Sequence, residues 1–102
     1  MNEVQSLTIE ILSGPLDGAV VTLEAETEWR KSGEGPLAFP WDAELGTPQA
    51  RFTLENDAWH LEGLDAPHGT YCINRDLQAT GKRVPLEEGD ILKASETWLL
   101  VR

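Results

Sequence analysis

The residues that could carry out chemistry are few in this chain, and their spacing matches no catalytic or metal-binding motif. The two histidines, His60 and His68, and the single cysteine, Cys72, lack the spacing of zinc ligands. Asp65 lies three residues before His68, as an acid–base pair can, but no G-x-S-x-G nucleophile motif accompanies it. The glycines of SGEGP (32–36) lack Walker spacing, and the aspartates form no EF-hand calcium loop. We therefore expect a non-enzymatic protein that needs no metal and no cofactor.

The charge balance narrows the range of partners. Eighteen acidic residues oppose eight basic ones, for a net charge of −10. Binding to nucleic acid or to an anionic membrane depends on clusters of Lys and Arg, so neither partner is expected. The start of the chain lacks the features of a signal peptide, and no apolar stretch approaches the roughly 20 residues of a membrane span. One cysteine excludes an intrachain disulfide and fits a reducing compartment, so a cytoplasmic location is expected.

Apolar and polar residues alternate with a period of two along most of the chain, which predicts β-strands. Turn residues separate the segments, and no stretch of 12 or more residues has helical spacing. Asn74 tolerates positive φ and is expected to turn a corner between two short strands. The pattern predicts a single domain, a β-sandwich or β-barrel. Its expected strands are 7–12, 19–25, 37–41, 50–56, 58–64, 70–73, 75–78, 84–92 (with a turn at 88–90) and 96–102.

The order of several motifs resembles that of forkhead-associated (FHA) domains. The matching segments are ILSGPLDGAVVTL (11–23), LAFPW (37–41), LGTPQARF (45–52), WHLEGLDAPHGTY (59–71) and VPLEEGDIL (84–92). The resemblance covers about residues 7–101 and implies one FHA-like domain over 1–102. The implied fold is an all-β, two-sheet antiparallel β-sandwich of the FHA/SMAD type. Three loops, 30–36, 42–49 and 65–70, are then expected to gather at one end as a binding rim.

The resemblance also implies where a ligand would bind, because FHA domains hold a phosphothreonine peptide on the loops at one end. In the family an Arg and a Ser hold the phosphate. Arg30 and Lys31 lie about where that Arg belongs, although a solvated pair at a loop mouth is the alternative. Gly46 stands in place of the Ser, where its backbone N–H could still face an anion, and Thr47 is a shifted substitute. Gln49 stands in place of a supporting His.

The second half of the implied site is also changed. Ala66 replaces the first Ser of the family's Ser-x-Asn-Gly-Thr loop, and His68 replaces its Asn, which grips the peptide backbone. Gly69 and Thr70 are retained, and a purely structural role in the turn is the alternative reading for both. Each lost charge-assisted hydrogen bond costs on the order of 1.5–3 kcal/mol, which is roughly ten- to a hundredfold in affinity.

The predicted function is therefore a protein–protein interaction module with weak or lost recognition of phosphothreonine peptides. Its partner is expected to be a protein or peptide, with or without phosphothreonine. Two alternatives remain open. One is a structural assembly domain, such as the cytoplasmic FHA-like part of an inner-membrane ring protein in a bacterial secretion system. The other is a working phosphothreonine reader with a rewritten site.

Overall fold

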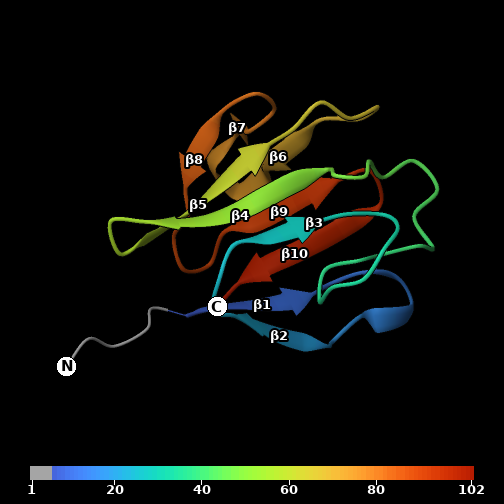
Figure 1. Ribbon diagram of the computed structural model, residues 1–102, viewed down its shortest axis with the longest axis horizontal. Coiled ribbons are helices and arrows are strands. Elements are labelled where there is room, and N and C mark those ends of the chain that lie inside the picture. Colours follow the sequence, from blue (N-terminus) through green and yellow to red (C-terminus); the bar gives the residue numbers. More distant parts are fainter. Residues whose placement is uncertain (1–5) are drawn as a thin grey trace.

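Ten strands form two antiparallel sheets in the computed structural model, which describes residues 6–102 (Figure 1). Residues 1–5 of the predicted domain lie outside the described part. The six-stranded sheet has the order β2 (Val20–Leu23), β1 (Leu7–Ile11), β10 (Thr97–Val101), β9 (Ile91–Ala94), β6 (Thr70–Cys72) and β7 (Leu77–Gln78). The four-stranded sheet has the order β3 (Thr27–Trp29), β4 (Ala50–Glu55), β5 (Ala58–Gly63) and β8 (Arg83–Pro85).

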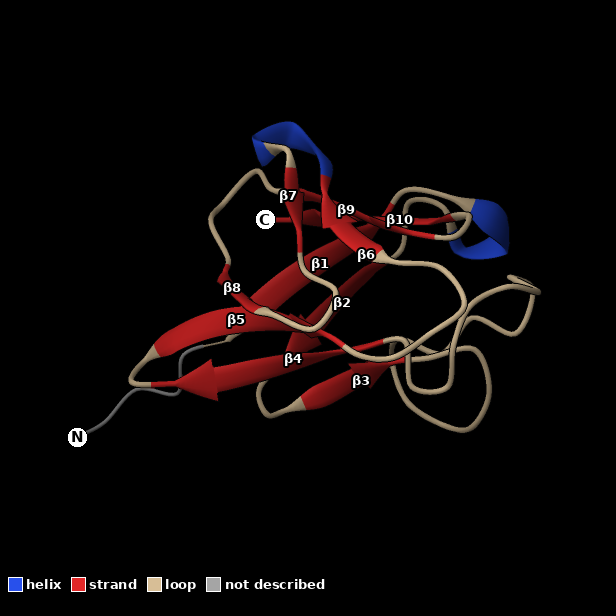
Figure 2. Ribbon diagram, turned by 90° about the horizontal axis from the view of Figure 1, so that it is seen from above, coloured by secondary structure: helices blue, strands red, loops and turns tan. Residues whose placement is uncertain are grey.

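The two sheets lie face to face as the layers of a sandwich (Figure 2), which confirms the predicted fold class. In β1, Leu7, Ile9 and Ile11 are buried while the residues between them are partly exposed. This alternation follows from the pleat of a strand, whose successive side chains point to opposite faces. The core between the sheets includes Trp29, Phe39, Phe52, Leu61, Leu92 and Leu99, all fully buried.

The hairpin of β4 and β5 shows how the sequence sets the register. Asn56 and Asp57 form its two-residue turn, and both have positive φ, 54° and 63°. Asn and Asp tolerate this conformation better than other residues with side chains, and such turns match the twist of the flanking strands. Glu55 pairs with Ala58 across the turn, and the ladder continues to Ala50 and Gly63. The turn predicted at 56–57 is confirmed.

The strand predicted at 37–41 is absent. Ala38 forms only an isolated parallel bridge with Arg30, and the rest of LAFPW is irregular. Pro40 has no N–H to donate to a ladder, which limits any strand there. Conversely β3, at Thr27–Trp29, was not predicted, because three residues are too few to show an alternating pattern.

The corner between β6 and β7 is built differently from the prediction. Strand β6 ends at Cys72, and residues Ile73–Arg75 form a single 3₁₀ turn. The residue with positive φ is Asp76, at 54°, and not Asn74. Asn74 instead uses its side-chain oxygen to accept a hydrogen bond from the N–H of Ile91 at 2.8 Å. Only Leu77–Gln78 of the strand predicted at 75–78 pairs with β6.

The remaining short helix is another 3₁₀ turn, at Gly14–Leu16. None of the helices within residues 6–102 is long and apolar enough to cross a membrane.

Candidate functional site

Three loops meet at one end of the sandwich, as predicted, and we call them the rim loops (30–36, 42–49 and 65–70; right side of Figure 1). The N–H of Lys31 donates to the carbonyl of Gly46 at 3.0 Å, which joins the first loop to the second. The side-chain amide of Gln49 donates to the carbonyl of His68 at 2.9 Å, which joins the second to the third.

Gln49 is the centre of this arrangement. Its side chain is fully buried and makes three hydrogen bonds. Besides the bond to the His68 carbonyl, its Nε2 donates to the hydroxyl of Thr70, and its Oε1 accepts from the N–H of Gly46. The expectation that Gln49 makes a structural hydrogen bond is therefore met by the geometry. Thr70 is also fully buried, so these two residues hold the rim loops together and do not face a ligand directly.

Gly46 does not present a free N–H at the rim. The expectation that this N–H could face an anion is wrong, since the Gly46 N–H donates to Gln49 Oε1 at 2.8 Å. A Cβ added at Gly46 would lie 2.7 Å from the Cβ of Ala66, closer than carbon atoms pack. The two positions at which the family would carry Ser residues are therefore in contact, and neither offers a side-chain hydrogen-bond donor.

The two candidate phosphate-binding cations, Arg30 and Lys31, have different contacts. Arg30 has its guanidinium against Gly33 and pairs with the carboxylate of Glu28 at 3.3 Å. Lys31 is the next residue, and its backbone N–H donates to the carbonyl of Gly46, so the backbone of Lys31 lies next to Gly46. Among residues 6–102 no ion pair involves Lys31. The Arg30 side chain is therefore paired with Glu28, whereas Lys31 has its backbone beside Gly46.

The other predicted residues line the rim with polar groups. The hydroxyl of Thr47 lies 3.2 Å from both the N–H and the hydroxyl of Ser32, so it links the first two loops. The imidazole of His68 is exposed and lies 3.9 Å from the carboxylate of Glu44, which is exposed too. A Cβ at Gly69 would come within 2.7 Å of the Tyr71 hydroxyl and 2.8 Å of the Thr80 hydroxyl, so a larger residue there would displace these side chains.

One buried carboxylate that supports the rim was not predicted. Asp42 is fully buried and ties the second rim loop to the turn between β9 and β10. It accepts hydrogen bonds from the hydroxyls of Ser95 and Thr97, both at 2.7 Å, and from the N–H of Glu96 at 3.0 Å. Burial alone would raise the pKa of Asp42. The hydrogen bonds outweigh that effect and hold its pKa below the ordinary value of 3.8.

Acid should therefore destabilise the domain through this group. A carboxyl group whose folded-state pKa is depressed stabilises the fold above its unfolded pKa, and this stability is lost as pH falls through the folded pKa. We expect the free energy of unfolding to hold steady from pH 7 to about 5 and to fall below about pH 4. Urea unfolding between pH 7 and 2 measures this. Asp42→Asn should be less stable at pH 7 and lose less on acidification; equal acid loss in the variant would contradict the assignment.

A second buried carboxylate lies away from the rim. Asp90 receives two hydrogen bonds from the guanidinium of Arg75, at 2.9 and 2.6 Å, and one from the N–H of Glu87 at 2.8 Å. Burial raises the pKa of Asp90, but the bonds from Arg75 and Glu87 overcome this and lower it below 3.8. Asp90 belongs to the PLEEGD motif, and this geometry gives that motif a structural role.

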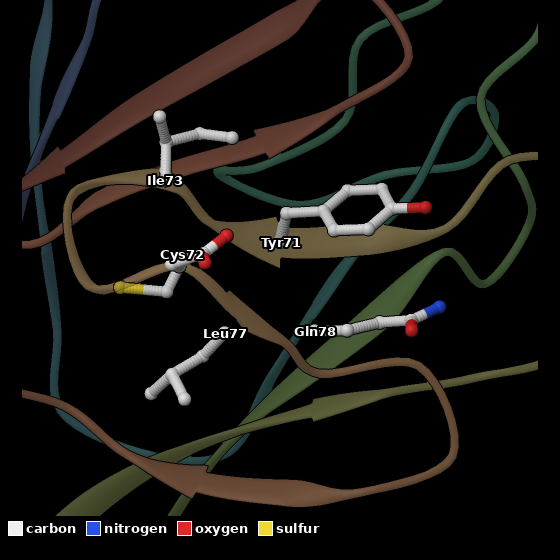
Figure 3. Close-up of a pocket in the computed structure, with 6 residues that line it drawn as sticks. Tyr71, Cys72, Ile73, Leu77 and Gln78 are labelled. Atoms are coloured by element: carbon white, nitrogen blue, oxygen red, sulfur yellow. The ribbon is translucent and has the colours of Figure 1, made fainter.

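Cys72 is fully buried, and its thiol donates to the Asn74 side-chain oxygen at 3.3 Å. Burial raises the pKa of this thiol, as expected for an inert apolar cysteine. Figure 3 shows Cys72 beside Tyr71, Ile73 and Leu77, and these residues line a shallow pocket of about 400 Å³. No group of His, Cys, Asp and Glu side chains in residues 6–102 is arranged to hold a metal ion.

Comparison with solved structures identifies the fold. The FHA domain of an Arabidopsis thaliana hypothetical protein superimposes with a TM-score of 0.83 and 22% identity, covering 97% of this chain and 86% of that one. An FHA domain from a study of phosphothreonine-dependent FHA interactions gives 0.77 and 19%, covering 95% of both chains. The FhaA FHA domain complexed with the intracellular domain of another protein gives 0.76 and 18%, covering 94% of this chain and 99% of that one.

No family model matches the chain, and no curated protein matches it by sequence. The structural likenesses nevertheless agree with one another over nearly the whole chain. The chain has the fold of an FHA domain, as the motif order predicted.

Proposed function

We propose that this chain is a non-catalytic protein-interaction module that binds a protein or peptide at its rim loops, with weak or no dependence on phosphothreonine. The observation that carries the proposal is the state of the Gly46 position. The Gly46 N–H already donates to Gln49, a Cβ at position 46 would collide with the Cβ of Ala66, and the cationic residue whose backbone bonds Gly46 is Lys31. The solved FHA domains described above support a binding role, since one is complexed with another protein's intracellular domain.

Charge works against a phosphate at this end of the molecule. Glu44 is two-thirds exposed beside His68, and the chain as a whole carries −10. A phosphothreonine adds about −2 at pH 7, so its approach meets a repulsive field. An unmodified or cationic peptide meets none. Gln49 and Thr70, which are buried, then act by shaping the rim, and the exposed Thr47 and His68 offer polar contacts along it.

A titration of the ¹⁵N-labelled domain with phosphothreonine peptides and their unphosphorylated twins tests the dependence on phosphate. We expect the phosphorylated and unphosphorylated peptides to give the same chemical-shift changes, or none, at peptide concentrations up to about 1 mM, the range of weak affinity. Lys31→Gln should then change little. Arg102→Gln removes the same charge at the far end of β10 and serves as the matched control.

One result would establish the second candidate, a working phosphothreonine reader. That candidate is favoured by the unpaired Lys31 at the rim and by the likeness to a domain studied for phosphothreonine-dependent interactions. Phosphate-specific shifts at Lys31 and residues 46–49, with micromolar affinity, abolished in Lys31→Gln and kept in Arg102→Gln, would replace our proposal by this one.

The binding role itself is tested in cells by photo-crosslinking. A photoreactive residue at Thr47 should capture a partner, whereas one at Glu55 should not, because the β4–β5 hairpin lies at the opposite end of the sandwich (left side of Figure 1). Capture from Glu55 alone would place the binding surface elsewhere and contradict the proposal.

A further inference from the structure

The outer face of the six-stranded sheet carries two rows rich in apolar side chains beside a polar row made by Thr8, Thr22 and Arg102. Strand pairing aligns the residues of the two apolar-rich rows across the sheet. The first row runs Val20, Glu10, Leu100 and Ile91, and the second runs Trp98, Lys93, Tyr71 and Gln78. Within these rows Val20 is 53% exposed and Tyr71 39%, and the other apolar members are partly exposed. Five of the eight side chains are therefore apolar and at least partly exposed, with Glu10 and Lys93 lying between them.

The outer face of the four-stranded sheet is entirely different. Arg51 lies within 4 Å of three carboxylates, those of Glu26, Glu28 and Glu62. Arg83 pairs with Glu62 on the same face, and with Glu55. This face therefore carries alternating positive and negative side chains, as expected for a surface exposed to solvent. A contiguous apolar surface on a soluble domain marks an interaction site, whereas scattered apolar residues do not.

Charge indicates what covers the apolar face. Its charged side chains are Glu10, which pairs with Arg102 at 2.8 Å, and Lys93. The Lys93 ammonium lies 5.7 Å from the centre of the Trp98 ring, and no ion pair involves it within the described residues. The face is thus not negative, although the chain carries −10. Two copies of this chain repel each other over most of their surfaces, and this face is where that repulsion is smallest.

We propose that the outer face of the six-stranded sheet binds a second copy of this chain. Strand β10 lies between β1, which carries Glu10, and β9, which carries Lys93. A two-fold axis across β10 therefore places Lys93 of each copy opposite Glu10 of the other, with Leu100 and Trp98 in contact at the centre. The interface is self-complementary, as a two-fold dimer requires.

The oligomeric state in solution tests this inference independently of the rim. Static light scattering between about 0.01 and 1 mM should show the average mass rising from the 11.3 kDa of one chain toward twice that value, with a dissociation constant on the order of 10–100 μM. Because salt screens the repulsion between acidic copies, dimerisation should strengthen between 0.05 and about 0.5 M salt. A monomer at about 1 mM in high salt would overturn the proposal.

Paired variants locate the interface. Leu100→Lys and Val20→Lys should each weaken dimerisation at least tenfold, while Ala58→Lys, the same charge change at an exposed strand residue of the other sheet, should leave it intact. Because Val20 is 53% exposed, we expect its replacement to leave the fold intact. Lys93→Glu should also separate the copies, and adding Glu10→Lys should restore them. Dissociation by Ala58→Lys with no effect of Val20→Lys would overturn the assignment.

Discussion

Replacing Arg75 with Met should lower the free energy of unfolding by about 3 kcal/mol at pH 7, because the substitution strands a buried carboxylate. Asp90 is 1% exposed and relies on two hydrogen bonds from the guanidinium. Arg75 also donates to the carbonyl of Pro85 at 2.7 Å, so it joins the β6–β7 corner to the end of β8. Removing one member of a buried pair costs more than the pair itself contributes, since the remaining charge keeps its desolvation penalty.

Urea unfolding of the parent and of Arg75→Met measures this loss. Arg83→Met is the matched control, because Arg83 and its partner Glu55 are both exposed and their ion pair is screened by water. The control should have nearly the same unfolding midpoint as the parent. Equal losses in the two variants would show that the Arg75–Asp90 pair has no special role in the fold.

Replacing Gln49 with Leu should cost about 3 kcal/mol and loosen the rim at the same time. The substitution keeps the size of the side chain but removes three hydrogen bonds, to Gly46, His68 and Thr70. A buried donor or acceptor left unpaired costs roughly 1–3 kcal/mol, and the Gly46 N–H and the His68 carbonyl both lose their partner. Hydrogen exchange at the Gly46 amide should accelerate by at least tenfold.

The exposed residue Gln78 supplies the control for this second variant, since Gln78→Leu makes the same chemical change without burial. It should alter neither the unfolding midpoint nor exchange at Gly46. A Gln49→Leu variant that unfolds at lower urea but keeps slow exchange at Gly46 would contradict the role of Gln49 as the link between the rim loops.

The parts of the fold that the sequence predicts are those governed by local patterns. The β1–β2 and β4–β5 hairpins follow from alternation and from the turn residues between the strands. Strand β3 is only three residues long, and its place is set by pairing with β4 twenty or more residues away. No local pattern encodes such a pairing, so it could not be predicted from the sequence.

The same distinction explains the site. Motif order placed the rim loops at one end, and that prediction is confirmed. The sequence could not say whether Arg30 or Lys31 lies beside Gly46. The backbone hydrogen bond from Lys31 to Gly46, which shows it, joins residues 15 positions apart. Asp42 bonds to Thr97, 55 positions along the chain, and a single sequence gives no sign of that contact. The role of Gln49 was partly visible, because an amide can both donate and accept.

The contact between Gly46 and Ala66 also constrains how such a rim can change over generations. A serine introduced at position 46 would bring its Cβ into the methyl group of Ala66, so the change is unfavourable while alanine remains there. Glycine at 66 removes the shortest of these contacts, and the carbonyl oxygen of Pro48 and Gln49 Oε1 would remain 3.1 and 3.2 Å from the added atom. A lineage that gained a serine at 46 would therefore meet less steric strain if the change at 66 came first, so the order of the two mutations matters.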